Sequence, residues 1–193
     1  MKTFAFIKES LQNIKTVGTV TRSSGFLSRQ MAKKVDYSEA QYVVELGAGD
    51  GVITKEILKR MAPDARLMIF EVNDKFFEQL KMIDDDRLIV VNDSAEYISK
   101  HLLQHGFIRV DAIVSAIPFV ILPENVRRSI IKKCIDVMKE EAPFIQVHYS
   151  LVLRNLYKEI FGNVKIGFVP LNIPPAFVMV SRKKEKELIN PIA

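Results

Sequence analysis

The sequence has one cysteine, no tryptophan and no continuous apolar run of the roughly 20 residues that a membrane span requires. A single cysteine excludes an intrachain disulfide framework and a cysteine-rich zinc cluster, so a reducing compartment is expected. Cys134 lies among apolar residues at helical spacing, which predicts a buried thiol rather than a nucleophile. Near the N-terminus, charged residues interrupt any apolar core of a signal peptide. We therefore expect a cytoplasmic protein.

Acidic residues are scarce at the N-terminal end. Residues 1–34 contain seven Lys or Arg and one acidic residue, Glu9, so the net charge there is +6 and the rest of the chain carries −1 of the total of +5. A negatively charged partner, either a phospholipid surface or a nucleic acid, would meet this end first. With 193 residues, 48% of them hydrophobic, the chain can bury one full core, and we expect a single domain over residues 1–193.

A first helix is predicted near residues 4–17, where apolar residues recur at intervals of three and four with lysines between them. The apolar residues are Phe4, Ile7, Leu11, Ile14 and Val17. Such a basic amphipathic helix either packs on the domain or lies in a membrane interface. A loop over residues 18–25 and a short helix near 26–35 follow, so residues 1–34 read as a basic helical extension.

From Gln41 onward, short apolar strands alternate with helices. The expected strands lie near residues 42–46, 67–72, 87–91, 110–116 and 143–149. The expected helices lie near residues 52–61, 74–82, 94–105 and 123–139. This order favours an α/β fold, in which a mostly parallel sheet is covered by helices on both faces.

After residue 149 the order of elements changes. A helix near residues 151–161 is followed by two β-rich pieces at 164–169 and 176–181, joined by the proline-rich residues 170–175. This arrangement suits a terminal antiparallel hairpin, which brings the expected sheet to seven strands. The tail over residues 182–193 is expected to be frayed.

The chain is organised around residues 43–51, where a short apolar strand runs into Glu45 and then into three glycines at alternate positions. Such glycines permit a sharp turn and leave room for a ligand beyond the carboxyl end of a strand. A dinucleotide site would place its last glycine one position later than Gly51, so the spacing counts against a pyrophosphate ligand. The carboxylate of Glu45 suits a ligand that carries an ammonium group.

Two further strand ends carry acidic residues. Glu71 lies 24 residues beyond Gly47, where a carboxylate can accept hydrogen bonds from both hydroxyls of a ribose, although a solvated acid is the simpler alternative. Residues 92–95 at the next strand end offer a carboxylate and backbone amides to an adenine edge. Asp93 is also well placed to be the N-cap of the following helix.

Taken together, residues 45–51, Glu71 and Asp93 resemble the cofactor site of the Rossmann-like, or class I, S-adenosylmethionine-dependent methyltransferases. The resemblance implies that the glycines lie under the methionine part of the cofactor, with Glu71 on the ribose hydroxyls and Asp93 on the adenine amine. The cofactor-binding residues that it implies are Glu45, Gly47, Ala48, Gly49, Gly51, Glu71, Val72, Asp93, Ser94 and Ser115.

The fourth strand end is expected to hold the methyl acceptor. Residues 115–119 resemble the Asn-Leu-Pro-Tyr segment of ribosomal RNA adenine dimethyltransferases, with Ser115 in place of the asparagine. They are more similar to the Ser-Gly-Leu-Pro segment of bacterial phospholipid N-methyltransferases, which a further proline follows, as Pro123 does here. Residues 146–149 and 172–176 resemble the Gln-Phe-Thr-Tyr and Asn-Leu-Pro-Pro-Ala segments of that family, and residues 18–24 resemble its Gly-x-x-x-Pro-Ser-Ser loop with Arg22 replacing the proline.

Methyl transfer to an amine needs alignment, an uncharged nitrogen and exclusion of water. We expect His148 and Tyr149 to orient or deprotonate the amine, while the backbone around Ser115, Pro118 and Phe119 shapes the cavity; ordinary strand hydrogen bonds are the alternative for His148 and Tyr149. His101 and His105 lie four apart on an expected helix, but no third ligand accompanies them, so no metal is expected.

Three functions fit these observations. The first is a peripheral membrane enzyme that binds a phospholipid surface through its basic N-terminal helix and methylates a headgroup amine of the phosphatidylethanolamine type. The second is methylation of RNA adenine, which Ser115 disfavours because it lacks an amide, and for which residues 150–193 are expected to leave no room for a helical RNA-binding domain. The third is a non-catalytic module that binds S-adenosylmethionine. Nothing in the sequence points to a stable protein partner.

Overall fold

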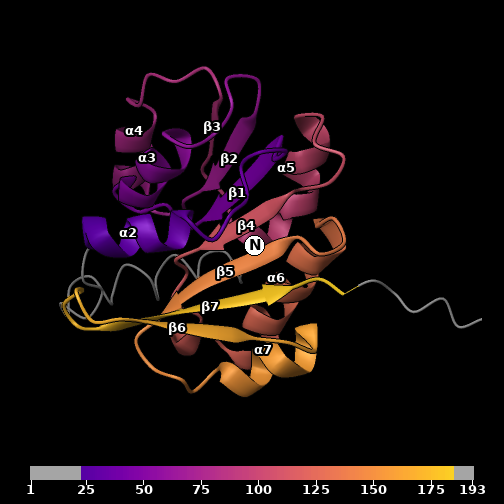
Figure 1. Ribbon diagram of the computed structural model, residues 1–193. Coiled ribbons are helices and arrows are strands. Elements are labelled where there is room, and N and C mark those ends of the chain that lie inside the picture. Colours follow the sequence, from indigo (N-terminus) through magenta and orange to yellow (C-terminus); the bar gives the residue numbers. More distant parts are fainter. Residues whose placement is uncertain (1–22, 185–193) are drawn as a thin grey trace, which may run out of the picture.

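The computed structural model describes residues 23–184, and its elements are labelled in Figure 1. The strands of the described residues are β1 (Tyr42–Leu46), β2 (Arg66–Phe70), β3 (Leu88–Val91), β4 (Ala112–Ser115), β5 (Pro143–His148), β6 (Lys165–Val169) and β7 (Ala176–Arg182). The α-helices are α2 (Gly25–Ala32), α3 (Val52–Leu58), α4 (Asp74–Leu80), α5 (Ile98–Gln104), α6 (Glu124–Val137) and α7 (Arg154–Phe161). Short 3-10 turns follow β3 and β4, namely η1 (Ala95–Tyr97) and η2 (Phe119–Ile121).

The described strands form one seven-stranded sheet in the order β3-β2-β1-β4-β5-β7-β6. β1 to β5 pair in parallel, whereas β7 is antiparallel to both β5 and β6. This is the Rossmann-like sheet with a terminal antiparallel hairpin, so the predicted fold is confirmed. The carboxyl ends of β1 to β5 lie at one edge of the sheet, and the turn between β6 and β7 lies at the same edge because β7 runs in the opposite direction. We call it the carboxyl edge.

Helices cover both faces of the sheet, as the continuous apolar strands require (Figure 1). One core contains the buried side chains of α5, α6 and α7, and the other contains those of α2, α3 and α4. In β1, Val44 and Leu46 belong to the first core and Val43 to the second. Cys134 on α6 is fully buried, which confirms the predicted buried thiol. Burial also raises the pKa of this thiol, so it is protonated and unreactive.

Several predicted element boundaries differ from the structure. The helix expected over residues 94–105 is divided into η1 and α5, because Ser94 caps a tight first turn through a hydrogen bond from the Glu96 N–H. The helix expected from residue 151 begins at Arg154. Arg182, assigned to the frayed tail, is the last residue of β7 and exchanges hydrogen bonds with Asn163. The helix expected over residues 4–17 lies outside the described residues.

The second helix of the predicted N-terminal extension is part of the folded core. α2 is capped by Ser24, whose hydroxyl accepts the Leu27 N–H at 3.1 Å. Leu27 and Met31 are fully buried in the same core as α3. None of the helices within residues 23–184 is long and apolar enough to cross a membrane.

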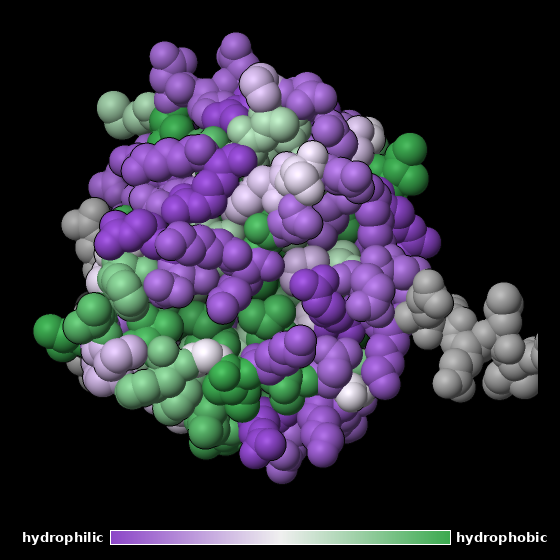
Figure 2. Space-filling view, viewed as in Figure 1, coloured by the Kyte–Doolittle hydropathy of each residue, from purple (hydrophilic) through white to green (hydrophobic). Residues whose placement is uncertain are grey.

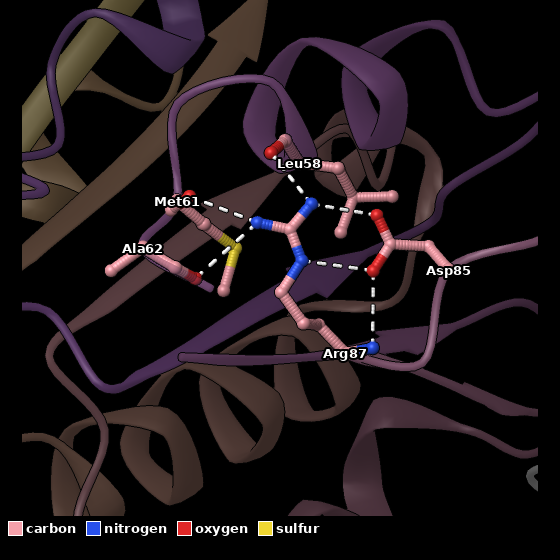
Figure 3. Close-up of polar contacts among 5 residues, drawn as sticks. All are labelled: Leu58, Met61, Ala62, Asp85 and Arg87. Carbon is pink, nitrogen blue, oxygen red and sulfur yellow. Dashed lines mark hydrogen bonds and ion pairs between the residues drawn. The ribbon is translucent and has the colours of Figure 1, made fainter. Parts of the chain in front are cut away.

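Arg87 fixes the position of α3 relative to the sheet (Figure 3). Its guanidinium donates hydrogen bonds to the carbonyl of Leu58, the last residue of α3, and to those of Met61 and Ala62 just beyond the helix, at 2.9 to 3.3 Å, and it pairs with Asp85 at 2.6 Å. The last carbonyls of a helix have no partner within it, and a cation near them also interacts favourably with the helix dipole. Holding this end of α3 keeps its other end, at Gly51, in place beside the glycine loop.

Candidate active site

The glycine loop joins β1 to α3 at the carboxyl edge. Gly47, Gly49 and Gly51 all have left-handed backbone angles, with φ of 73°, 58° and 78°. A Cβ at Gly47 would approach the backbone of Ile117 to 3.2 Å, and one at Gly51 would approach Leu80 to 3.0 Å. A Cβ at Gly49 would meet nothing within 4 Å, so this glycine borders open space. Packing therefore explains two of the glycines, and the open space beside Gly49 is where a ligand could approach the loop.

Glu71 holds this loop from the end of β2. One oxygen of its carboxylate accepts the Gly49 N–H at 2.8 Å, and the other accepts the Asn73 N–H at 2.8 Å. The side chain is buried. Each carboxylate oxygen has a second lone pair, so both can still accept a ligand hydroxyl. The structure thus brings Glu71 and the glycine loop together, as the sequence predicts.

Glu45 is the most unusual carboxyl group of the site. It is fully buried at the end of β1 and accepts a 2.6 Å hydrogen bond from the Thr54 hydroxyl, while its Oε1 has no partner among the described residues. Burial raises the pKa of Glu45 to about 8; the Thr54 hydrogen bond opposes this rise, and the carboxylates of Glu71 and Asp50 add to it. A buried acceptor without a partner is costly, and a cation beside it removes that cost.

This arrangement fits S-adenosylmethionine. The unpaired oxygen of Glu45 can accept a hydrogen bond from the ammonium group in the methionine part of the cofactor. The carboxylate of Glu71 can accept hydrogen bonds from the ribose hydroxyls. The open side of Gly49 allows the ligand to approach the backbone closely. The hydrogen-bond acceptors and the open space that such a cofactor needs are therefore present together at the ends of β1 and β2.

Val72 follows β2, and Asp93 and Ser94 follow β3, the neighbouring strand of the sheet. Asn92 links them to β2 by donating to the backbone carbonyl of Glu71 at 3.1 Å. The structure corrects the predicted N-cap: Ser94, not Asp93, caps the following turn. Asp93 accepts the Ser94 N–H at 2.7 Å and contacts Nε2 of His101 at 2.9 Å.

His101 is thus engaged by a carboxylate of the cofactor region. Within residues 23–184, no group of three or more His, Cys, Asp and Glu residues is placed to hold a metal ion.

At the end of β4, Ser115 and Phe119 are fully buried and Pro118 is half-buried. The Ser115 hydroxyl accepts the Ile117 N–H at 3.4 Å, which fixes the start of the loop. Phe119 packs in the core that also contains the buried side chains of α6 and α7, and this packing anchors the loop to the core. Their contact with an acceptor stays a prediction.

His148 and Tyr149 differ in their surroundings. His148 is the last residue of β5, and Tyr149 is the first residue after the strand. His148 is buried and its Nε2 lies 3.1 Å from the hydroxyl of Tyr157 on α7, while Tyr149 is 39% exposed. Burial lowers the pKa of His148 to about 4, so its imidazole is neutral at physiological pH. Their catalytic roles stay predictions.

Three polar residues beyond those predicted contribute to this region. Gln146 on β5 is fully buried, pairs in register with Ser115, and donates to the carbonyls of Ile117 and Val147 at 2.9 and 2.7 Å. Tyr157 is the partner of His148. Asn172, in the turn between β6 and β7, accepts the Ser24 N–H at 3.0 Å. Alternation along β5 puts Gln146 and His148 on one face, and that signal was available in the sequence.

The sheet order and the carboxyl-edge site together define a Rossmann-like methyltransferase. No protein-family model matches the chain. It is 30% identical over 176 residues to the ornithine lipid N-methyltransferase of Singulisphaera acidiphila, covering 90% of this chain and 92% of that protein. The chain therefore belongs to the class I S-adenosylmethionine-dependent methyltransferases, and S-adenosylmethionine is its cofactor.

Other similarities cover less of the sequence or show the fold alone. Over 88 residues, the chain is 28% identical to the ribosomal RNA small subunit methyltransferase H of Christiangramia forsetii, covering 46% of this chain and 28% of that protein. The fold is similar to that of an inferred rRNA methylase from Clostridium thermocellum, with a TM-score of 0.64 and 17% identity over 86% of this chain and 99% of that one. An inferred methyltransferase from Streptococcus mutans, solved in complex with SAH, gives a TM-score of 0.61 and 15% identity over 84% and 99% of the two chains.

Proposed function

We propose that this protein transfers the methyl group of S-adenosylmethionine to the amine of a membrane-lipid headgroup. The observation that carries the proposal is the similarity to ornithine lipid N-methyltransferase, which extends over nine-tenths of both chains. The resemblance of residues 115–119, 146–149 and 172–176 to phospholipid N-methyltransferases supports the same class of acceptor.

The headgroups in question share one chemistry. Phosphatidylethanolamine and ornithine lipid each present a primary amine close to an anion, a phosphate in the first and a carboxylate in the second. Phosphatidylethanolamine is the acceptor suggested by the sequence resemblance, and ornithine lipid is the acceptor named for the relative. We propose the amine, in either setting, as the group that is methylated.

The acceptor region suits an uncharged amine. A primary amine has a pKa near 10 in water, so it must lose a proton before it can attack. Bound S-adenosylmethionine supplies an electrophilic methyl group. No Asp or Glu lies in residues 112–123 or 142–153, which follow or form the ends of β4 and β5, so nothing there stabilises the ammonium form. Gln146 Oε1, buried and without a partner among the described residues, can accept an N–H and orient the nitrogen.

His148 and Tyr149 are proposed to assist this step from the end of β5. The neutral imidazole of His148 can accept a hydrogen bond from the amine, and its contact with Tyr157 fixes the orientation of the ring. Tyr149 is partly exposed at the carboxyl edge, where a headgroup would enter. Association of the protein with a membrane surface, including any part played by residues 1–22, belongs to the proposal as well.

The test is methyl transfer from labelled S-adenosylmethionine by the purified full chain. Phosphatidylcholine vesicles are supplied with phosphatidylethanolamine, with ornithine lipid or with neither, and ribosomal RNA is offered in a parallel reaction. We expect label in one or both amine lipids and none in vesicles without them. Label that appears in RNA and in no lipid would overturn the proposal. Gly49→Val, which fills the open side of the glycine loop, serves as the cofactor-blocked control.

RNA adenine methylation is the competing outcome of this experiment. The segment shared with the ribosomal RNA methyltransferase covers under half of the chain. RNA binding depends on Lys and Arg side chains that neutralise phosphates, and residues 112–123 and 142–153 contain neither. The surroundings of the acceptor loop therefore favour a lipid over a nucleic acid.

A further inference from the structure

Large hydrophobic side chains are exposed in three segments at the carboxyl edge. Together they form what we call the carboxyl-edge patch, in which Val152, Leu171 and Ile173 are 74%, 67% and 83% exposed. The members are Val120 and Ile121 after β4, Tyr149, Leu151 and Val152 after β5, and Phe168, Leu171 and Ile173 at the β6–β7 turn. Soluble surfaces rarely collect so many apolar side chains without a binding partner.

The fold brings these segments to one side of the molecule. Strands β4 and β5 are parallel and end at the same edge, and His148 at the end of β5 pairs in register with Phe177 near the start of β7. The β6–β7 turn therefore lies beside the segment that follows β5. Figure 2 shows hydrophobic surface gathered where Figure 1 draws this turn and β6, whereas the surface over α3 and α4 is mostly hydrophilic.

Charge is absent from the same segments. Residues 112–123, 142–153 and 166–181 contain no Asp, Glu, Lys or Arg. A nucleic acid would require basic side chains here, and an acidic group would be repelled by an anionic membrane. An uncharged apolar surface suits the acyl boundary of a lipid bilayer.

The part of the chain that precedes the described structure is basic in sequence. Residues 1–22 contain four Lys or Arg and one acidic residue, and this segment joins the described structure at Ser23. The next residue, Ser24, is bonded to the patch turn: its N–H donates to Asn172 at 3.0 Å and its hydroxyl donates to the Leu171 carbonyl at 3.3 Å. A cationic segment thus begins beside an apolar surface, which is the combination that binds anionic bilayers.

We propose that the carboxyl-edge patch docks directly on the surface of a lipid bilayer. Docking in this orientation turns the loop after Ser115 toward the lipid headgroups, because that loop and the patch share one edge of the sheet. The inference rests on the proposed lipid acceptor and adds a membrane-contacting surface within the folded domain, separate from residues 1–22.

The experiment compares two double variants that introduce the same polar, uncharged side chain. Val152→Gln with Leu171→Gln alters the patch from two segments, and Leu103→Gln with Ile108→Gln is the matched control. The control side chains are 81% and 87% exposed at the end of α5 and before β4, at the opposite edge of the sheet. Binding is measured by co-sedimentation with phosphatidylcholine vesicles that contain phosphatidylglycerol. We expect the patch variant to lose about tenfold or more in vesicle affinity, and the control to bind like the wild type.

Two further measurements separate docking from folding and chemistry. Affinity for S-adenosylmethionine should be unchanged in both variants, and methyl transfer to lipid amines should fall for the patch variant in vesicles but not in detergent micelles. Equal vesicle binding by wild type and patch variant, or a dimer that the patch variant alone dissociates while vesicle binding is kept, would overturn the docking proposal. A wild-type protein that methylates no lipid overturns the proposed function instead, whatever the vesicle binding shows.

Discussion

The side-chain amide of Gln146 on β5 donates a 2.9 Å hydrogen bond to the backbone carbonyl of Ile117, in the loop that follows β4. The same amide donates to the carbonyl of Val147, and Gln146 is fully buried. Ser115 supports the loop from its other side by accepting the Ile117 N–H. The Ile117 peptide is therefore held at both its N–H and its C=O, and its position depends on two neighbouring strands.

The variant Gln146→Leu is expected to loosen this loop. Removing the amide takes away one of the two donors of the Ile117 carbonyl, which keeps the Phe119 N–H at 2.8 Å, so the loss of stability is about 1 kcal/mol. We expect kcat for methyl transfer to fall by about tenfold, because a loosened loop aligns the acceptor less well with the cofactor. Affinity for S-adenosylmethionine, measured by calorimetry, should change little. Gln104→Leu, on the exposed side of α5, is the control; unchanged kcat in Gln146→Leu would show that the amide is purely structural.

The fold and the cofactor side of the site could be predicted because their signals are local. Strands with apolar runs alternate with helices along the chain, and each cofactor-side residue lies at the end of a strand or shortly after it. Glu45, Gly49 and Glu71 meet in the structure because parallel strands end at one edge. The predicted N-cap, Asp93, was wrong by one residue because Asp and Ser both cap helices and the two residues are adjacent.

The acceptor side was less predictable because its contacts join distant parts of the chain. The partner of His148 is Tyr157, nine residues later on a helix, and Asn172 is bonded to Ser24, 148 residues earlier. Such pairings depend on register and packing, which local spacing does not specify.

Glu45 predicts a pH dependence of cofactor binding. Because its pKa is about 8 in the folded protein against about 4.5 when unfolded, the free protein holds a proton there between these values. Pairing with the ammonium group of S-adenosylmethionine favours the carboxylate, so binding should release a proton and affinity should rise between about pH 6 and pH 7.5. Calorimetry in buffers of different ionisation enthalpy measures this release.

The matched variants for this test are Glu45→Gln and Glu78→Gln. The first removes the titrating group, so proton release and the rise in affinity with pH should both disappear. The second changes an exposed residue of α4 and should behave like the wild type. Proton release that persists in Glu45→Gln would exclude Glu45 as its source.

His148 predicts a loss of stability in acid. Its pKa is lowered from 6.5 to about 4 by burial, so the unfolded chain binds a proton in this range and the folded protein does not. The resulting stabilisation is present above pH 6.5 and is lost as the pH falls toward 4, by up to about 3 kcal/mol. When the free energy of unfolding is measured with urea at several pH values and plotted against pH, its slope should be shallower for His148→Gln than for the wild type. His105→Gln leaves the His148–Tyr157 contact in place and should keep the slope; an unchanged slope in His148→Gln would contradict this account.

Gly49→Ala distinguishes space for a ligand from backbone strain. Alanine at a left-handed position costs roughly 1–2 kcal/mol, and Gly106 offers a matched case, with φ of 75° against 58° and no atom within 4 Å of the added Cβ in either position. We therefore expect similar losses of stability in Gly49→Ala and Gly106→Ala, measured by urea unfolding. Affinity for S-adenosylmethionine should fall by about tenfold or more only in Gly49→Ala, because there the Cβ enters the space that the cofactor needs. If both variants bound the cofactor like the wild type, the open side of Gly49 would not face the ligand, and the glycine would be required for the turn alone.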